Sequence, residues 1–413
     1  MEASQNTRMD APRRLVAVTS DEPFPPNCGH RVEQWNRYQA LRRADFELFL
    51  VTWRSPSDPP HATETDAQLQ KVFKTVRVFD IKHNLHSFLL RLIRLMRYPS
   101  HVASRIMPQE EQQNLLRDIE HFRPDAVLID NIYGSHIGSV IAKHFNIPTI
   151  VRSHNIEHIY IRQQGKLATS YRDKISWNLA CLGLRRHEIQ LLRSSRWILD
   201  ISMDDINFWR SIGITHNSWL PTLFPALADK AVPSIPWPVR RWDICYIGNL
   251  RLPNNVTGLD WFLSKCYPIL VHSKPNIKIC ISGSNPCPAM LDLSLRYPDV
   301  DYHWNSPTVE EILSDGRVLI NPILSGSGIN VKSVEMLMYD SPVVTTERGV
   351  RGFSTEICNE FLISSEPEGF AHAILQELEQ PFILTGSRIA ARAIFGEAGV
   401  KIMISDIEAA IQN

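Results

Sequence analysis

Short runs of apolar residues alternate along this chain with segments of helical periodicity, and this alternation restricts the fold more than any other feature of the sequence. Strands that alternate with helices pair in parallel, so the pattern predicts an α/β fold built on parallel sheets. In the first half of the chain the predicted strands are Leu15–Thr19, Phe46–Thr52, Ala126–Asp130, Thr149–Arg152 and Trp197–Ser202.

The same alternation starts again after a proline-rich segment. Five prolines lie between residues 221 and 238, which is typical of a linker between domains. A length of 413 residues suits two domains. We therefore expect two Rossmann-like domains with a cleft between them, residues 1–224 and 225–413. The strands predicted beyond the linker are Asp243–Ile247, Lys278–Ser282, Asp301–Trp304, Val318–Asn321 and Val343–Thr345, and the helices are Val256–Leu270, Val309–Ser314 and Asn330–Tyr339.

Charge and cysteine content exclude several classes of protein. The 44 basic residues balance the 44 acidic ones, and the basic excess up to Phe224, 29 against 23, is too small for a nucleic-acid binder. The seven cysteines show no zinc spacing, which favours reduced thiols in a cytosolic protein. Residues 1–14 contain no apolar run, so we expect no signal peptide, and no apolar stretch approaches the ~20 residues that span a bilayer. Any work at a membrane is therefore expected at its surface.

The strongest candidate site lies where the strand ending at Asn321 leads into a helix that begins near Ile329. The loop Gly326-Ser327-Gly328 lets backbone N–H groups approach an anion closely, and a helix N-terminus adds partial positive charge. These features favour a phosphate group as the ligand.

Two charged residues follow on one face of that helix. Lys332 lies in the first turn, where a cation is disfavoured unless it has an anionic partner, and Glu335 follows three residues later. A nucleotide diphosphate would satisfy both, with the phosphates on Lys332 and the ribose hydroxyls on Glu335. A tight turn with a simple ion pair would show the same spacing, and the ending of a P-loop is absent.

Residues 326–346, GSGINVKSVEMLMYDSPVVTT, resemble the donor-site segment of family 4 glycosyltransferases, which have the two-domain GT-B fold. Three further segments match the family in the same order along the chain. They are Pro25–Arg31 in the first glycine loop, Ser153–Glu157 around the active-site histidine, and Tyr246–Asn255 at the start of the second domain.

The resemblance implies a role for each matching residue. In the second domain, Glu335 would bind the ribose, Lys332 the phosphates, and the amides of Gly328, Ile329 and Asn330 the distal phosphate or sugar, with Arg251 adding charge. In the first domain, Gly29 would let its loop close over the diphosphate. His154 would contact the transferred sugar or support the departing diphosphate. His30 and Arg31 belong to the same first-domain loop, on the acceptor side.

The resemblance also implies the reaction. The family retains the anomeric configuration and needs no metal, so we expect neither a metal nor a cofactor beyond the sugar donor. Asp130, at the end of a strand, could act as an orienting base on the acceptor side, although an aspartate before Asn131 more often caps a helix or a turn. Where many members carry glutamate this chain has Ser327, a variant similar to a branch that builds exopolysaccharides or lipid-linked glycans. Asp299-Val300-Asp301 has the form of a metal-binding motif but is interpreted as surface.

The acceptor side offers a basic amphipathic segment, residues 82–107. It holds five Lys or Arg and no acid, with apolar residues at helical spacing such as Leu89, Ile93 and Met96. Such a helix would suit an anionic membrane surface and a lipid-pyrophosphate acceptor. A domain helix with its apolar face in the core fits the same pattern.

The predicted function is transfer of a sugar from a nucleotide-diphosphate donor to a glycan or lipid-linked glycan. The protein would be cytoplasmic and peripheral on the inner face of the plasma membrane. The first domain would bind the acceptor and the second the donor, and a last helix, about 402–411, would cross back to the first domain. A nucleotide-sugar epimerase and a catalytically silent binding protein of the same fold remain alternatives.

Overall fold

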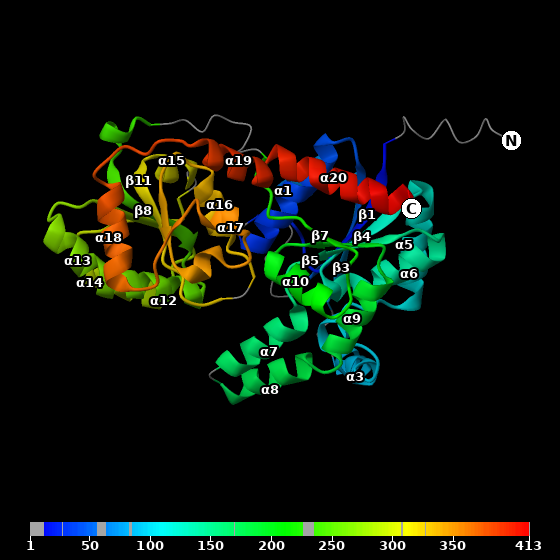
Figure 1. Cartoon of the computed structure of the whole chain (residues 1–413). Coiled ribbons are helices and arrows are strands. Elements are labelled where there is room, and N and C mark those ends of the chain that lie inside the picture. Colours follow the sequence, from blue (N-terminus) through cyan, green and yellow to red (C-terminus); the bar gives the residue numbers. More distant parts are fainter. Residues whose placement is uncertain are drawn as a thin grey trace. The chain divides into compact units, whose positions relative to one another are not determined.

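A computed structural model describes residues 12–26, 28–55, 63–81, 85–168, 170–225, 235–306, 309–326 and 328–412 (Figure 1). The chain forms two compact units. One comprises Met1–Leu220 together with Val400–Asn413, and the other comprises Pro221–Gly399. The second unit begins at the first of the five linker prolines, and residues 226–234 of the linker lie outside the described residues.

The first unit is built on a seven-stranded parallel sheet with the strand order β3-β2-β1-β4-β5-β6-β7. The runs of Val, Ile and Leu predicted as strands form its centre, because strands covered by helices on both faces are apolar throughout. The strands are β1 (Arg14–Thr19), β2 (Glu47–Arg54), β3 (Thr75–Asp80), β4 (Ala126–Asp130), β5 (Thr149–Ser153), β6 (Trp197–Asp200) and β7 (Asn217–Trp219).

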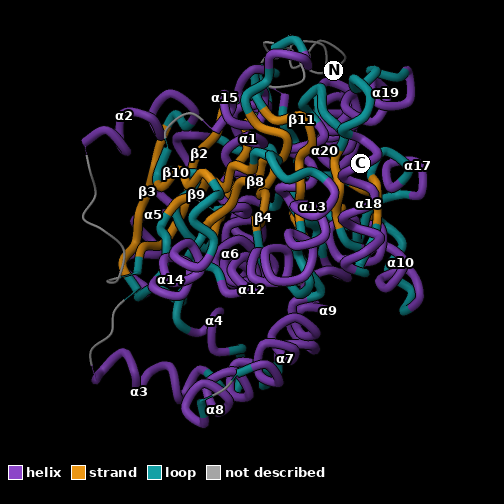
Figure 2. Tube along the Cα trace, turned by 90° about the vertical axis from the view of Figure 1, so that its left-hand side faces the viewer, coloured by secondary structure: helices purple, strands orange, loops and turns teal. Residues whose placement is uncertain are grey.

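Helices join these strands and cover the sheet. Three of them, α3, α7 and α8, lie at one end of the first unit, away from the strands (Figure 2). The helices of this unit are α1 (Gly29–Arg43), α2 (Thr63–Val72), α3 (Leu85–Arg94), α4 (Ser100–Ala103), α5 (Gln109–Phe122), α6 (Ser135–Phe145), α7 (Glu157–Leu167), α8 (Tyr171–Ala180), α9 (Leu184–Ser194), α10 (Met203–Ser211) and α20 (Glu397–Gln412).

The second unit is built on a six-stranded parallel sheet with the order β10-β9-β8-β11-β12-β13. The helix predicted over Val256–Leu270 is interrupted by a π-helical stretch, Phe262–Cys266. The strands are β8 (Trp242–Asn249), β9 (Ile279–Ser284), β10 (Asp301–Trp304), β11 (Gly316–Asn321), β12 (Val343–Thr345) and β13 (Leu362–Ile363). The helices are α12 (Pro253–Trp261), α13 (Tyr267–Ser273), α14 (Pro288–Arg296), α15 (Val309–Ser314), α16 (Val331–Leu337), α17 (Thr355–Cys358), α18 (Pro367–Glu377) and α19 (Gly386–Phe395).

Both sheets confirm the predicted α/β class and its Rossmann-like topology. In each sheet the strand order reverses once, between β1 and β4 in the first unit and between β8 and β11 in the second. Loops leaving the carboxyl ends of two such strands diverge, and ligands of open α/β sheets bind in the crevice between them. The two places at which a ligand is expected are therefore the ends of β1 and β4 and the ends of β8 and β11.

The last helix, α20, belongs to the first unit although it follows the second unit in sequence. Met403 and Ile407 on α20 are fully buried. The hydroxyl of Ser218 on β7 donates a hydrogen bond to Asp406 Oδ2 at 2.6 Å. Among the described residues, no helix combines the length and the apolar content that crossing a bilayer requires.

Candidate active site

The loop between β11 and α16 depends on its two glycines. Gly326 has a φ of 136° and Gly328 a φ of 66°, backbone conformations that favour glycine. Ser327 between them lies outside the described residues. The base of the loop is tied down by Asn321, whose Nδ2 donates to Ser333 Oγ at 2.9 Å, and Ser333 in turn donates to the carbonyl of Gly349 at 2.6 Å. The start of α16 is thereby fixed against the end of β11.

Lys332 extends from α16 across the switch point of the sheet. Its Nζ donates to Asn255 Oδ1 on α12 at 2.8 Å and to the hydroxyl of Tyr246 on β8 at 3.0 Å. The ammonium also lies 4.7 Å from the centre of the Tyr246 ring. All of these partners are neutral, and within the described part of the chain no carboxylate lies within ion-pair distance of Nζ. The charge of Lys332 is held in position but has no anion in contact.

Burial shifts the protonation of Lys332 and Glu335 in opposite directions. Loss of water lowers the pKa of Lys332 to about 7, although the nearby carboxylate of Glu335 favours the charged form. Loss of water raises the pKa of Glu335 to about 7, against the attraction of Lys332. An anion entering beside Lys332 would stabilise the ammonium and restore its charge.

The end of β8 forms the other side of this site. A Cβ added at Gly248 would stand 2.4 Å from the Tyr246 hydroxyl. Glycine therefore leaves room for this hydroxyl, which accepts the hydrogen bond from Lys332. Arg251 follows in an exposed turn, with its backbone N–H bonded to Asn249 Oδ1 at 3.1 Å. Its guanidinium makes no hydrogen bond or ion pair with the residues that the structure describes. Arg251 therefore lies near the strand end but is not fixed there.

In the first unit, His154 comes directly after β5, and Asp130 is the last residue of β4. His154 Nε2 lies 2.7 Å from Asp130 Oδ1, and the histidine side chain is only 10% exposed. Burial alone would raise the pKa of Asp130, but the charge of Arg37 and the bond to His154 outweigh it and hold this pKa well below its usual range. Asp130 thus stays ionised and orients His154.

Three further charged side chains, all fully buried, surround this pair. Arg37 on α1 donates to Asp130 Oδ2 at 2.7 Å and to Glu33 Oε1 at 3.0 Å, and Arg152 on β5 donates to Glu33 Oε1 at 2.8 Å. Ligand atoms of Glu33, Asp130 and His154 lie within 4.8 Å of one another, as in a metal site. However, two guanidinium groups already neutralise the two carboxylates. We interpret the cluster as an ion-pair network that fixes His154.

The sequence analysis names His154 and Asp130 but none of the three buried charged residues around them. Glu33 and Arg37 have the spacing of an ordinary surface pair on a helix, and nothing in the sequence shows that both are buried. Arg152 is the one of the three that the sequence makes conspicuous, because an arginine near the end of an apolar strand needs a buried acid. That signal predicts a partner without identifying it as Glu33.

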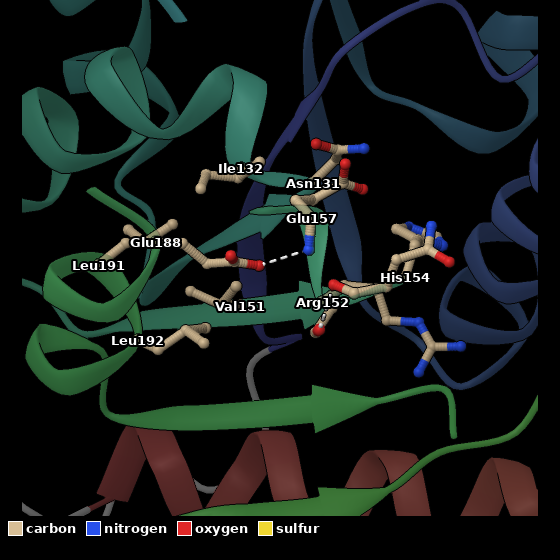
Figure 3. A pocket seen from close by; sticks show the side chains of 11 residues that line it. Asn131, Ile132, Val151, Arg152, His154, Glu157, Glu188, Leu191 and Leu192 are labelled. Atoms are coloured by element: carbon tan, nitrogen blue, oxygen red, sulfur yellow. Dashed lines mark hydrogen bonds between the residues drawn. The ribbon is translucent and has the colours of Figure 1, made fainter. Parts of the chain in front are cut away.

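A pocket beside His154 contains a second acidic pair, Glu157 and Glu188 (Figure 3). Glu188 on α9 accepts the backbone N–H groups of Glu157 at 2.7 Å and of His158 at 3.1 Å, so it caps the N-terminus of α7. The hydroxyl of Tyr133 donates to Glu157 Oε2 at 3.0 Å. Burial, together with the charge of Glu188, raises the pKa of Glu157 to about 7.

The first glycine loop, after β1, carries Gly29, His30 and Arg31. Gly29 begins α1, and both following side chains turn back to Asp21. His30 Nε2 and Arg31 Nε each lie 3.0 Å from Asp21 Oδ2. The structure thus brings His30 and Arg31 together at one carboxylate, whereas His154 and Asp130 form a separate pair at the ends of β4 and β5.

Residues 241–380 match a sequence profile described as "Glycosyl transferases group 1". Over 373 residues the chain is 25% identical to an "Uncharacterized 44.6 kDa protein in cps region" of Klebsiella pneumoniae, covering 88% of this chain and 90% of the relative. The sequence match thus covers the second unit, and the relative spans nearly the whole chain.

Solved structures match the fold of the whole chain. HepE of Anabaena, solved with UDP, is 13% identical with a TM-score of 0.62 and covers 96% of this chain and 100% of its own. A G117R mutant of S. aureus TarM, solved with fondaparinux, α-GlcNAc-glycerol and UDP, is 10% identical with a TM-score of 0.64, covering 97% and 100%. Residues 241–380 thus match the group 1 glycosyltransferases, and the chain as a whole has the GT-B fold.

Proposed function

We propose that this protein is a retaining glycosyltransferase that moves a sugar from a nucleotide-diphosphate donor to a glycan or lipid-linked glycan acceptor. The observation that carries the proposal is Lys332, a desolvated ammonium with only neutral partners beside a loop of two glycines in left-handed conformations. A diphosphate would supply the missing negative charge. UDP is the first nucleotide to test, because HepE and TarM were solved with it.

In the proposed reaction, negative charge develops on the departing diphosphate as the glycosidic bond breaks. Lys332, the amides of Gly328, Ile329 and Asn330, and the guanidinium of Arg251 would stabilise that charge, a contribution that is often the largest single term in catalysis. Glu335 would accept hydrogen bonds from the ribose. No metal is required for this division of roles.

His154 is proposed to contact the transferred sugar. Its Nε2 bond to Asp130 fixes the ring, so Asp130 is a positioning residue rather than a base. The first unit would bind the acceptor, with Gly29 near the diphosphate and His30 and Arg31 on the loop that follows β1.

Two exposed apolar stripes support a lipid-linked acceptor. On and after α3, Leu89, Leu92, Ile93 and Met96 recur at helical spacing, with Ile93 66% and Met96 91% exposed. This face is not in the core, so the alternative of an ordinary domain helix does not fit. On α8, Tyr171, Ile175 and Leu179 form a second stripe, with Tyr171 86% exposed. Both helices lie at the same end of the first unit (Figures 1 and 2), and α4 packs against both.

The charge around these stripes favours an anionic lipid surface. Described residues 85–107 carry only basic charge, and on α7 and α8 the one exposed acid is Asp173. The surrounding bases are Arg91, Arg94, Arg97, Arg162, Lys166, Arg172 and Lys174. Apolar residues flanked by bases bind the interface of a membrane that contains acidic lipids. We infer a peripheral protein at the inner face of the plasma membrane. The relative from a cps region is consistent with polysaccharide biosynthesis.

A thermal-shift series with UDP, GDP, ADP, dTDP and CMP tests the donor site. A ligand at a hundred times its dissociation constant adds about 2.7 kcal/mol, which raises Tm by several degrees. We expect one nucleotide to stabilise the wild type and the Lys265→Ala control, an exposed lysine of the same unit, but not Lys332→Ala or Glu335→Ala. Stabilisation of all four proteins alike would contradict the assignment of the site.

The same preparation separates the alternatives. A silent binding protein would give no shift with any nucleotide while remaining folded. An epimerase would convert the donor sugar in the absence of an acceptor. A transferase should release nucleotide at a rate that rises when acceptor is added.

Liposome flotation tests the lipid surface. We expect binding to vesicles that contain phosphatidylglycerol, weakened at least tenfold in an Ile93→Ser, Ile175→Ser variant and weakened by salt in the wild type. Leu295→Ser is the control, since Leu295 of the second unit is an apolar side chain that is even more exposed, at 79%, than Ile93. Equal flotation of the double variant and the wild type would rule out these stripes as the contact.

A further inference from the structure

Three side chains of the loop after β1 form a chain of contacts, and the proposed transfer gives a role to His30 alone among them. Cys28 Sγ lies 3.4 Å from His30 Nδ1, and the other ring nitrogen, Nε2, lies 3.0 Å from Asp21 Oδ2. A cysteine, a histidine and an acid in this order is the arrangement that activates a thiol nucleophile, with the acid orienting the imidazole.

The surroundings of the sulfur favour its anion. Cys28 is the N-cap residue of α1, a helix of 15 residues with no acid in its first turn, so the positive end of the helix faces the thiol. Burial would raise the pKa of Cys28, but the contact with His30 outweighs it and the net shift is downward.

The histidine is held in its charged form. Burial alone would lower the pKa of His30, whereas the bond to Asp21 and the contact with Cys28 raise it to about 10. Asp21 itself is fixed by Arg31 Nε at 3.0 Å and by the Ser20 hydroxyl at 2.8 Å. The guanidinium of Arg105 donates to the Ser20 carbonyl and lies close enough to act on Asp21. Asp21 therefore stabilises the imidazolium of His30, and Arg31 stabilises Asp21.

Burial dominates at several of the other cysteines. Cys245, Cys266 and Cys280 are buried, and burial raises the pKa of Cys266 to about 12. Cys181 is half-buried like Cys28, yet burial raises its pKa. Cys181 thus provides a comparison within the same molecule.

We propose that Cys28, with His30 and Asp21, is a modification site for soft electrophiles, with hydroperoxides as its biological reagent class. With a hydroperoxide, the thiolate sulfur attacks the distal oxygen, an S–O bond forms and the O–O bond breaks. Sulfur is oxidised by two electrons, and the departing alkoxide takes the proton from the His30 imidazolium. The products are a sulfenic acid and an alcohol. With iodoacetamide, an S–C bond forms and iodide leaves.

Modification would place a substituent next to Gly29, which the proposed transfer assigns to the diphosphate. That consequence rests on the proposed function, whereas the reactivity of Cys28 does not. Labelling rates measured without nucleotide therefore test the thiol even if the donor assignment fails.

The experiment measures alkylation of the full-length chain by iodoacetamide at pH 6, with each cysteine followed by peptide mass spectrometry. We expect Cys28 to react at least about tenfold faster than Cys181, and His30→Gln to slow Cys28 about tenfold. His144→Gln, a change at an exposed histidine of α6, should leave the rate unchanged. Hydrogen peroxide followed by dimedone should tag Cys28 in the wild type and not in Cys28→Ser.

The pH profile separates an activated thiol from one that is merely accessible. The wild-type rate at Cys28 should reach its plateau at a lower pH than the rate in His30→Gln, which should rise with pH as that of an ordinary thiol does. A Cys28 rate no higher than that of Cys181, or an unchanged rate in folded His30→Gln, would overturn the proposal.

Discussion

Lys332 and Glu335 each lose water where α16 meets the ends of β8 and β11, and their pKa values therefore lie near 7. At pH 8 the free protein holds Lys332 largely uncharged and Glu335 largely ionised. A bound diphosphate would raise the pKa of Lys332, so binding at pH 8 must take up a proton.

Calorimetry of UDP binding in two buffers of different ionisation enthalpy should therefore show uptake of about one proton at pH 8. The affinity should fall by up to about tenfold per pH unit above 7, because the proton must be supplied from a more basic solution. Lys332→Gln should show no uptake. A wild type whose binding is independent of pH between 7 and 9 would mean that Lys332 does not meet the phosphates.

Glu157 makes the stability of the free protein, rather than nucleotide binding, depend on pH. Its pKa is about 7 in the folded protein, against 4.5 for an ordinary glutamate carboxyl, so the folded state holds the proton more tightly. The contribution of the protonated Glu157 to the unfolding free energy is complete below pH 4.5 and is lost as the pH rises through 7. Glu157→Gln should flatten the fall in unfolding free energy between pH 5 and 7, at most about 1.4 kcal/mol per pH unit. Urea titrations at several pH values measure this, and parallel curves for wild type and variant would contradict it.

At the scale of elements, the sequence predicts the strands whose residues are all apolar. β1, β4 and β5 are buried over almost their whole length, and their runs of Val, Ile and Leu cannot be accommodated elsewhere. The edge strand β3 was not predicted, because its half-exposed residues need no continuous apolar run. β7 and β13 are too short to give a periodicity.

The α7–α8 hairpin escapes prediction for a related reason. In α8 only Ala180 is buried, so the apolar residues of this helix do not mark a core-facing side. The loop around Gly326 and Lys332 could be predicted because local spacing decides it. The pairing of Glu33 with Arg152, 119 residues apart, could not, because it depends on how α1 meets β5.

Gly258 on α12 tests how closely the donor loop depends on its neighbours. A Cβ there would stand 2.3 Å from the carbonyl oxygen of Pro322, just after β11. Gly258→Ala should lower stability by about 1–3 kcal/mol and weaken nucleotide binding, since α12 also carries Asn255, which holds Lys332. Gly386→Ala is the control, because a Cβ at this position meets no atom within 4 Å. Equal stability of the two variants in urea would show that α12 can move without cost.

At the scale of the molecule, the first unit is completed by a segment that follows the second. Ile407→Ala on α20 should cost about 2–5 kcal/mol, because the side chain is fully buried. Amide exchange should quicken in β6 and β7 and stay unchanged in β8 and β9. Ile402→Ala, on the same helix but 46% exposed, serves as the control. Faster exchange confined to β8 and β9 would contradict the assignment of α20 to the first unit.

The return of α20 also fixes the order in which the protein can mature during its synthesis. Its buried residues Met403 and Ile407 are synthesised only after the whole of Pro221–Gly399. Domains generally fold as units while the chain is made. The unit translated first must therefore wait, with the surface that α20 will cover still open, until α20 has left the ribosome.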